Sequence, residues 1–351
     1  MVSVGSAVPD INVSNQQLSQ LVDTSDEWIT ARTGIKNRKI LGTNQSLVDL
    51  AVKAAENTLS KSSIKPEEID LIILATSSAD DLFGSAGQIQ KRIGASNAAA
   101  FDVTAACSGF IVSLIIAHQF LATRTYNNIL IIGADVLSRW VNWLDRNTCI
   151  LFGDAAGAML LKSSSPDNLL GFKLKTNGKN NHDLVLPQTS KYKKFTSDLT
   201  IVQGGYNYIS MNGREVYKFA TSEVPKIIQN TLELIDMVLT QVDWLVLHQA
   251  NKRILKTIAD KLGFPNDKLI SNLELYGNTS AASLPLVLDE AIQDNKIKTN
   301  DIIVLAGFGA GLTWGAVVVR VRCSTKIIIK FHSLENSNNS YSFEVNKTMI
   351  F

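Results

Sequence analysis

Cysteine is scarce in this sequence, and neither sign of charge is in large excess. Three cysteines occur in 351 residues, at positions 107, 149 and 323, and none belongs to a Cys-x-x-Cys pair. An odd number of widely spaced cysteines argues against a disulfide framework or a zinc site and favours a reducing compartment. The formal net charge is +2, so the composition implies no general surface for nucleic acid.

Long apolar runs are also lacking. The most apolar helical stretch, "GFIVSLIIAHQFLA" at 109–122, is too short to span a membrane and contains a histidine, so it indicates a core helix. The first ten residues, "MVSVGSAVPD", have neither the basic segment of a signal peptide nor the Arg- and Ser-rich character of a transit peptide. We therefore expect neither a membrane partner nor a targeting segment.

The sequence does contain an internal repeat. "NTL" at 57–59 and at 230–232 is followed in both places by Ile-Asp or Val-Asp and then by an apolar strand. The same offset of 173 residues relates "ILIIGA" at 129–134 to "IIVLAG" at 302–307. In the first half, a helix around 46–60, the strand "LIILATS", a helix over 107–122 and the strand "NILIIGAD" alternate. Two such halves predict an α/β architecture of five alternating layers.

The motif "FDVTAACSGF", 101–110, places Cys107 between the predicted strand "AAFDV" and the helix that follows. Most free cysteines are small, buried hydrophobic residues. A helix N-terminus, however, favours the thiolate over the thiol, which would make Cys107 a nucleophile. The small residues around it leave room for a substrate.

A thiolate that makes and breaks thioesters needs partners that handle protons or stabilise an oxyanion. Among the four histidines, His248 ends the buried strand of "DWLVLHQAN", where α/β folds place their chemistry, although most histidines at strand ends are structural. Asn278 in "GNTSAAS" has the pattern of a turn and an N-cap. "GFGAGLTWGA", 307–316, is followed by a strand, so it indicates a glycine-rich turn near a ligand and not a dinucleotide loop.

Six motifs, in this order and spacing, resemble the β-ketoacyl-acyl carrier protein synthase III family, the initiating condensing enzymes of type II fatty acid synthesis. They are "TSDEWITARTGIKNR", "FDVTAACSGF", "FGDAAGA", "HQANKRI", "GNTSAAS" and "GFGAGLTWG". The resemblance covers roughly residues 1–322 and looks closest to the cyanobacterial and red-algal plastid branch. It implies the thiolase fold, a duplicated five-layer αβαβα structure, and a plastid stroma or bacterial cytoplasm as the place of action.

Carried over residue by residue, the resemblance implies a triad of Cys107, His248 and Asn278. Cys107 would take an acetyl group from acetyl-CoA, and malonyl-acyl carrier protein would lose CO2 and attack the acyl-cysteine. His248 and Asn278 would act as neutral donors to the enolate oxygen. The amide of Cys107 and the turn with Gly309 and Ala310 would hold the oxyanion of acyl transfer. No cofactor and no metal are implied, and Asp154 reads as a turn residue.

The resemblance also implies contacts with coenzyme A and with a second subunit. Adenine would stack between Trp28 and Arg146, with Thr24 and Arg32 nearby, because an indole and a guanidinium suit a flat base and its phosphates. Phe83 matches the residue that crosses the interface of a homodimer and limits the length of the primer.

The predicted helix 251–263 carries basic residues beside an apolar face, for which a solvated surface is the default interpretation. In the family this helix docks the acidic acyl carrier protein. Here the implied docking residues are Gln249, Ala250, Asn251, Lys252 and Arg253, with Arg214 and Lys218 close by.

The predicted division is an N-terminal half, 1–161, a C-terminal half, 162–322, and an extension, 323–351, that the family lacks and that should be weakly packed. Relative to the family, few residues precede "SVGSAVP", so the first strand is expected to be short. Two alternatives stay open. One is a thiolase-fold acyltransferase or thioesterase that uses Cys107 without decarboxylation. The other is a non-catalytic interaction subunit, which should have lost the cysteine or its partners.

Overall fold

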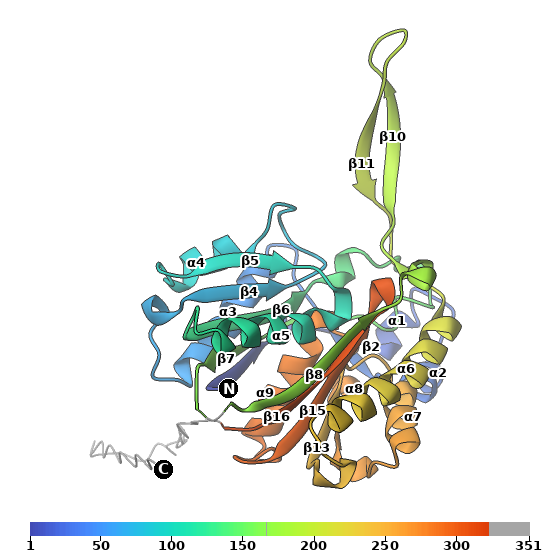
Figure 1. Cartoon of the computed structure of the whole chain (residues 1–351). Coiled ribbons are helices and arrows are strands. Elements are labelled where there is room, and N and C mark those ends of the chain that lie inside the picture. The colour runs from blue at the N-terminus through green and yellow to red at the C-terminus, as the bar shows by residue number, and fades with distance from the viewer. Residues whose placement is uncertain (166, 323–351) are drawn as a thin grey trace, which may run out of the picture.

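The computed structural model describes residues 1–165 and 167–322, and the predicted extension 323–351 lies outside this range. Two five-stranded sheets lie one behind the other, with helices between them and on both outer sides (Figure 1). This arrangement gives the five alternating layers of the predicted thiolase fold.

The N-terminal sheet has the strand order β1-β7-β6-β4-β5. The two central strands β6 and β4 run parallel, and β7 is antiparallel to β6 and to β1. Apolar runs such as "LIILA" suit strands that are covered on both faces. In sheet order the strands are Ser3–Ala7, Ala155–Lys162, Asn128–Asp135, Leu71–Ala75 and Ala99–Val103.

The C-terminal sheet repeats this order strand by strand, as β8-β16-β15-β13-β14, with the same directions. Its strands are Leu169–Thr176, Thr313–Arg320, Ile302–Gly309, Trp244–Leu247 and Leu269–Ile270. The repeat found in the sequence is therefore a repeat of structure. The predicted division between residues 161 and 162 falls at the last pair of residues in β7.

The central layer contains one helix from each half, α5 (Gly109–Ala122) and α9 (Ser283–Gln293). Helix α5 is apolar almost all round, because it is covered by a sheet on each side. The sequence predicted this helix from residue 107, but it begins at Gly109. Cys107 lies in a 3₁₀ turn before it, Ala106–Ser108, in which Ser108 Oγ donates to the carbonyl of Ala105 at 2.6 Å.

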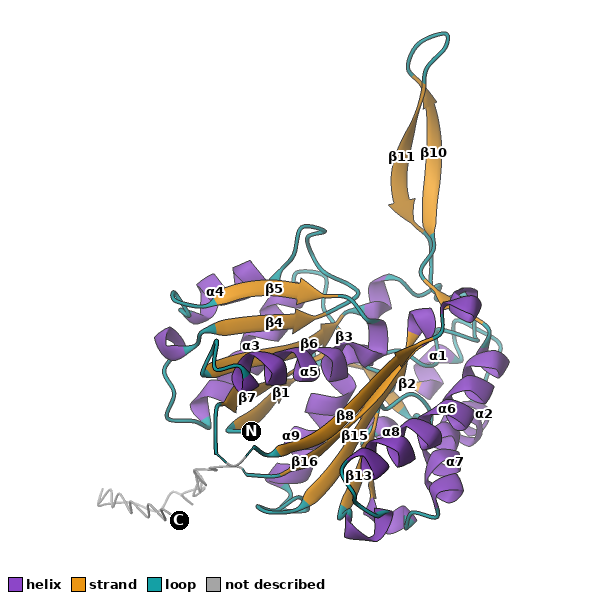
Figure 2. Ribbon diagram, viewed as in Figure 1, coloured by secondary structure: helices purple, strands orange, loops and turns teal. Residues whose placement is uncertain are grey.

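The outer layers are built from amphipathic helices (Figure 2). Helices α3 (Leu47–Ser60) and α4 (Ala86–Ile93) cover the N-terminal sheet, and α6 (Gly213–Leu234) and α7 (Lys252–Leu262) cover the C-terminal sheet. Helix α3 closely matches the predicted helix 46–60, because Ser46 and Asp49 form a capping box at its start. Among the described residues, no helix is long and apolar enough to cross a membrane.

The remaining elements surround one end of the sheets. They are α1 (Asn15–Leu18), α2 (Asp26–Thr33), α8 (Leu273–Tyr276), β2 (Ile11–Ser14), β3 (Asn37–Ile40), β9 (Leu184–Val185) and β12 (Ser210–Met211). A hairpin of β10 (Gln188–Lys194) and β11 (Thr200–Tyr206) projects away from the body of the molecule (Figure 1).

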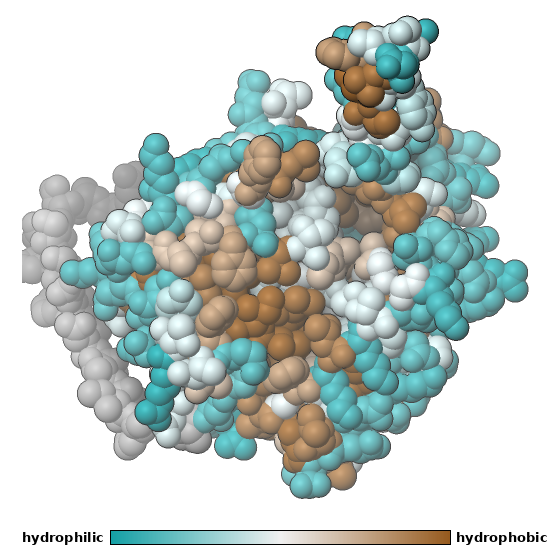
Figure 3. Space-filling view, turned by 45° about the horizontal axis from the view of Figure 1, so that its top comes forward, coloured by the Kyte–Doolittle hydropathy of each residue, from teal (hydrophilic) through white to brown (hydrophobic). Residues whose placement is uncertain are grey.

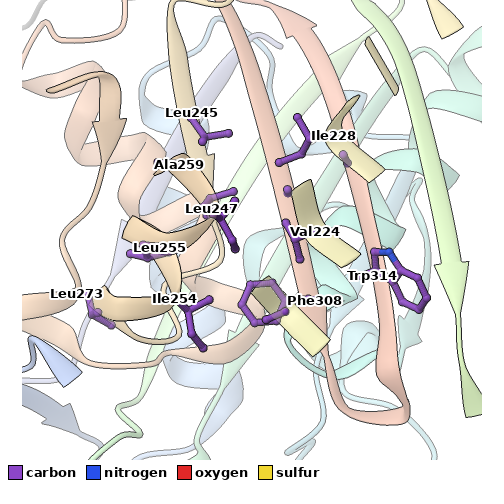
Figure 4. Packing of buried hydrophobic residues seen from close by; sticks show 14 of the residues in the cluster. Val224, Ile228, Leu245, Leu247, Ile254, Leu255, Ala259, Leu273, Phe308 and Trp314 are labelled. Carbon is purple, nitrogen blue, oxygen red and sulfur yellow. The ribbon is translucent and has the colours of Figure 1, made fainter. Parts of the chain in front are cut away.

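The largest apolar cluster joins α6 and α7 to the outer face of the C-terminal sheet. Val224, Leu247 and Leu255 pack there, and the ring of Phe308 lies among the same side chains (Figure 4). Phe308 also contacts His248. The packed core therefore fixes the position of the Phe308 ring beside the imidazole.

Candidate active site

Cys107 lies where β5 has ended and the central helix α5 is about to begin. Its side chain is buried, and the preceding Ala106 has a φ of 47°, in the left-handed region. Backbone conformations of this kind cost a non-glycine residue on the order of 1–3 kcal/mol and collect at functional sites. Gly309 packs directly against the turn, because a Cβ at that position would stand 2.7 Å from the Cys107 amide nitrogen. A ligand can therefore reach the Cys107 amide only because residue 309 is a glycine.

The thiol is protonated in the free protein. Burial raises the pKa of Cys107 from 9.0 to about 12, a hydrogen bond from Ser280 lowers it, and the Asp135 carboxylate raises it further. The sequence predicted that the helix N-terminus favours the thiolate, whereas burial favours the thiol in the unliganded protein. The cost of removing a thiolate from water exceeds what the helix end returns.

His248 follows β13 and is buried. Its backbone N–H donates to the carbonyl of Ala306 at 2.8 Å, which continues the pairing of β13 with β15. The ring Nδ1 lies 2.7 Å from the hydroxyl of Ser283 on α9, and Phe308 packs edge-on against the ring. Burial lowers the pKa of His248 from 6.5 to about 3. The imidazole is therefore neutral near pH 7 and has one N–H to donate.

Asn278 lies in the turn between α8 and α9. Its backbone bridges to the segment around Phe152: its N–H donates to the carbonyl of Leu151 at 2.8 Å, and its carbonyl accepts from Gly153 at 3.0 Å. The side-chain Oδ1 accepts from the backbone N–H of Ser280 at 2.9 Å. This bond orients the amide, and Nδ2 has no hydrogen-bond partner among the described residues, so it is available as a donor.

These three side chains line one cavity of about 790 Å³. Residues from both halves of the chain line the cavity, and sequence reasoning missed several of them. Phe308 is the clearest omission, although it stands inside the glycine-rich motif that the sequence singled out. Further lining residues include Ile150, Leu151, Phe152, Leu184, Met211 and Leu312.

Trp28 and Arg32 lie on the same cavity, on helix α2. The guanidinium groups of Arg32 and Arg146 lie 5.0 and 5.2 Å from the centre of the Trp28 ring. Arg146 also donates to the carbonyl of Asp23 at 2.9 Å. The predicted indole of Trp28 and guanidinium of Arg146 are therefore adjacent, and in this structure they contact each other directly. The hydroxyl of Thr24 is buried without a hydrogen-bond partner.

The predicted docking residues divide into an exposed and a buried group. Lys252 and Arg253 are exposed at the start of α7, and Ala250, Asn251 and Arg253 line the cavity together with Arg214 and Lys218. Gln249 is 1% exposed. Its amide donates to the carbonyl of Leu247 at 2.7 Å and accepts from the Ser271 hydroxyl at 2.7 Å, so it cannot contact a protein partner.

Six predicted residues do not line the cavity, namely Thr24, Phe83, Arg146, Gln249, Lys252 and Ala310. Phe83 is fully exposed in the loop before α4. Ala310 lies in the turn after β15, next to Gly309, and is half-buried. In this single chain, neither side chain reaches the cavity that Cys107 lines.

Two carboxylates are fully buried near the site, and burial raises the pKa of both. Asp154, predicted as a turn residue, accepts hydrogen bonds from the backbone of Leu41 and from both the backbone and the hydroxyl of Ser138. It therefore ties segments together. Asp135 ends β6, and sequence reasoning assigned it no role. Each stands at the end or start of an apolar strand, which was the available signal.

Two family models match this chain. One, described as 3-oxoacyl-[acyl-carrier-protein (ACP)] synthase III, covers residues 101–178, and the C-terminal model of the same family covers residues 232–321. The first match contains Cys107, and the second contains His248 and Asn278.

Similar proteins are found in red algae and cyanobacteria. A β-ketoacyl-[acyl-carrier-protein] synthase III of Porphyra purpurea is 53% identical over 91% of this chain and 98% of its own length. One from Nostoc sp. is 54% identical over 90% and 95%. The crystal structure of 3-oxoacyl-[acyl-carrier-protein] synthase III from Aquifex aeolicus is 39% identical, has a TM-score of 0.84, and covers 91% of this chain and 99% of its own.

Proposed function

The chain belongs to the β-ketoacyl-[acyl-carrier-protein] synthase III family, and we propose that Cys107 carries the acyl group in its reaction. The enzyme condenses acetyl-CoA with malonyl-acyl carrier protein to acetoacetyl-acyl carrier protein, CO2 and CoA, which initiates type II fatty acid synthesis. The observation that supports the residue assignment is the convergence of Cys107, His248 and Asn278 on one cavity from separate elements of both halves.

In the first half-reaction, Cys107 Sγ attacks the carbonyl carbon of the acetyl thioester. The new S–C bond replaces the bond to coenzyme A, and the thiol proton leaves with the coenzyme A thiolate. Negative charge develops on the carbonyl oxygen, for which the Cys107 amide beside Gly309 is the proposed donor. Because burial raises the pKa of Cys107, the thiol proton has to leave Sγ before or during the attack.

In the second half-reaction, malonyl-acyl carrier protein loses CO2 and its thioester oxygen takes up the negative charge. The proposed donors are Asn278 Nδ2 and His248 Nε2. The Ser283 oxygen accepts from the backbone N–H of Gln249 at 3.4 Å, and we assign the serine hydrogen to His248 Nδ1, 2.7 Å away. The ring proton then sits on Nε2. The enolate carbon attacks the acyl-cysteine, and the Cys107 thiolate leaves and is reprotonated.

We assign the coenzyme A site to Thr24, Trp28, Arg32 and Arg146. Opening the contact between Arg146 and Trp28 would admit the adenine between them, and the unpartnered hydroxyl of Thr24 would gain a partner. The acyl carrier protein is assigned to the basic mouth of the cavity at Ala250, Asn251, Lys252 and Arg253. Gln249 is not part of this surface.

We further propose that the enzyme is a homodimer. Leu82 and Phe83 are 83% and 102% exposed in the loop before α4, and β5 is an edge strand of the N-terminal sheet. Apolar side chains also gather in the middle of the face that Figure 3 shows, below the projecting hairpin. Two copies joined along β5 would cover such a surface and bring Phe83 toward the neighbouring cavity. Sedimentation of wild type and Phe83→Asp tests this: a variant that stays dimeric contradicts the assignment of Phe83.

The reaction needs only its two thioester substrates, and we propose no cofactor. Relatives from red algae and cyanobacteria are the ground for proposing the plastid stroma or a bacterial cytoplasm as its location.

One assay tests the function. The purified protein is incubated with labelled acetyl-CoA, first alone and then with malonyl-acyl carrier protein, and intact mass is measured at each stage. We expect label on the peptide that contains Cys107, followed by its transfer to acetoacetyl-acyl carrier protein. Label that reaches Cys107 but ends as free acetate would indicate a thioesterase. No label on the protein would contradict acyl-cysteine chemistry.

A further inference from the structure

The two halves treat one matching position differently. The strand β15 ends at Gly309, which packs against the Cys107 amide, whereas the equivalent strand β6 ends at Asp135. Asp135 is 0% exposed. It accepts hydrogen bonds from the Thr76 hydroxyl, the Ser77 backbone and the Ser78 hydroxyl at 3.2, 2.8 and 2.8 Å. A fourth donor, the Ala281 backbone N–H at 3.2 Å, comes from the other half of the chain.

Ser280, which precedes Ala281, lies between this carboxylate and the nucleophile. Its hydroxyl donates to Cys107 Sγ at 3.3 Å, and it also lowers the pKa of the nearby Asp135 carboxyl. Ser280 is 1% exposed, and its φ of 50° is in the left-handed region. The hydroxyl therefore has one hydrogen for two acceptors, and its burial keeps it away from water.

We propose that Ser280 is a positioning residue whose hydroxyl turns between Asp135 and Cys107 Sγ as Cys107 changes its charge. When Cys107 is a thiol, its S–H donates to Ser280 Oγ, and the serine hydrogen points to Asp135. When Cys107 becomes a thiolate, the serine hydrogen turns to Sγ. No covalent bond changes in this step, which is a rotation about the Cβ–Oγ bond. The inference rests on the proposed role of Cys107 as the acylated thiol.

The surroundings of Cys107 make this donor important. The titratable groups that face it are Asp135 at the end of β6 and His248 after β13, and the imidazole is neutral. A thiolate at this place therefore lies near a carboxylate, and no described cation is among the groups that shift the pKa of Cys107. The serine hydrogen is the group that can stabilise either anion in turn.

The test compares two substitutions that both remove the hydroxyl. Ser280→Ala keeps a side chain in the left-handed turn, whereas Ser280→Gly relieves its strain. The alkylation rate of Cys107 by iodoacetamide is followed from pH 6 to 10, because this rate reports the thiolate fraction. We expect both variants to react roughly tenfold more slowly than wild type, equivalent to about one pKa unit. Ser113→Ala, which removes a buried hydroxyl on α5 outside the cavity lining, should alkylate at the wild-type rate.

Asp135→Asn supplies the opposite arm. Removing the negative charge should speed alkylation, because the thiolate is no longer repelled and the serine hydrogen has one fewer anionic competitor. Wild-type alkylation in Ser280→Ala and Ser280→Gly would overturn the proposal. So would a change confined to the variant with the lower thermal stability, since that result reports backbone strain. If Asp135→Asn does not fold, the Ser280 pair decides alone.

The same data separate this proposal from the function. Alkylation needs no substrate. Slower alkylation in both Ser280 variants together with no acetyl label on wild type would therefore reject the function and retain the proposed rotation of the Ser280 hydroxyl. Normal condensation by wild type together with wild-type alkylation rates in both Ser280 variants would reject only the proposed rotation of the Ser280 hydroxyl.

Discussion

The two halves of the molecule share a strand order and directions, but only the N-terminal half carries the thiol. Each half enters its central helix through a short 3₁₀ turn, Ala106–Ser108 in one and Ser280–Ala282 in the other. Both turns open on a residue with positive φ, 47° at Ala106 and 50° at Ser280. The scaffold was therefore duplicated with its strained turn, and single side chains decide which copy reacts.

The partner positions differ in the same way. Ala75 ends β4 at the place where His248 follows β13, and its methyl group packs against Gly109 at the start of α5. Gly309 leaves the Cys107 amide open, whereas Asp135 fills the matching place and accepts from Ala281. An internal carboxylate thus occupies in one half the position at which the other half would bind a reacting oxyanion. This parallel supports the proposed oxyanion donor.

Replacing Cys107 by serine should have the largest effect, because it removes the thiol that distinguishes the two turns. A buried serine hydroxyl lacks thiolate character, so we expect a loss of acetyl transfer on the order of 10⁴-fold or more. Transfer of labelled acetyl from acetyl-CoA, followed by intact mass, measures it. Acetylation of the serine variant at a rate near wild type would mean that the nucleophile lies elsewhere.

His248→Ala and Asn278→Ala should separate the two half-reactions. Each removes a donor to the enolate, at a cost of about 3 kcal/mol in the transition state, or roughly 150-fold in decarboxylation of malonyl-acyl carrier protein. Acetylation of Cys107 should continue, and this labelling is the internal control. If His248→Ala abolished acetylation as completely as loss of the thiol, the division of roles would have to be abandoned.

Gly309→Ala should close the place beside the Cys107 amide, as Asp135 fills the equivalent place in the other half. The added methyl group would stand 2.7 Å from the Cys107 amide nitrogen and displace an oxyanion from it. We expect acetyl transfer to fall by roughly 100-fold, the usual loss for one oxyanion donor. Gly87→Ala is the matched control, because nothing lies within 4 Å of a Cβ there. Unchanged acetylation in Gly309→Ala would reject the amide as the donor.

The buried imidazole, which has no counterpart at Ala75, should destabilise the fold in acid. The pKa of His248 is about 3 in the folded protein, against an ordinary value of 6.5 for a histidine in water. Below about pH 6.5 the unfolded chain therefore binds a proton at this histidine that the folded chain does not bind. Between pH 7.5 and 5.5 this should lower the free energy of unfolding by about 1.4 kcal/mol. Urea unfolding at both pH values measures it, with His248→Gln as the control. An equal loss in the control would assign the effect to other groups.

The outer helices α4 and α7 follow equivalent strands, and only α7 lies at the cavity mouth. Arg253→Glu on α7 should raise the apparent KM for malonyl-acyl carrier protein by roughly tenfold, or about 1.4 kcal/mol, and higher salt should narrow this gap. Acetyl-CoA transfer should change little. Lys91→Glu on α4 makes the same charge reversal on an exposed residue and should leave both substrates unaffected. Equal losses toward both substrates in Arg253→Glu would remove the docking assignment.

Local pattern in the sequence determined the layered α/β fold, its duplication, and the candidates Cys107 and His248. The role of Asn278 was implied only by the resemblance of the six motifs to the synthase III family. Buried strands and strand-to-helix turns have short-range signatures, so the pattern suffices for them. The pattern could not assign Gln249, because its burial depends on Leu247 and Ser271 from neighbouring strands and turns.

Tertiary structure alone decided the protonation state of Cys107. Sequence reasoning placed Cys107 at a helix end and expected a thiolate, but the two sheets close over it and the thiol keeps its proton. Ser280 and Asp135 entered the site in the same way, from positions 173 residues away and at the end of another strand. A charge in a protein interior responds to everything packed within a few ångströms, and only the assembled halves bring those groups together.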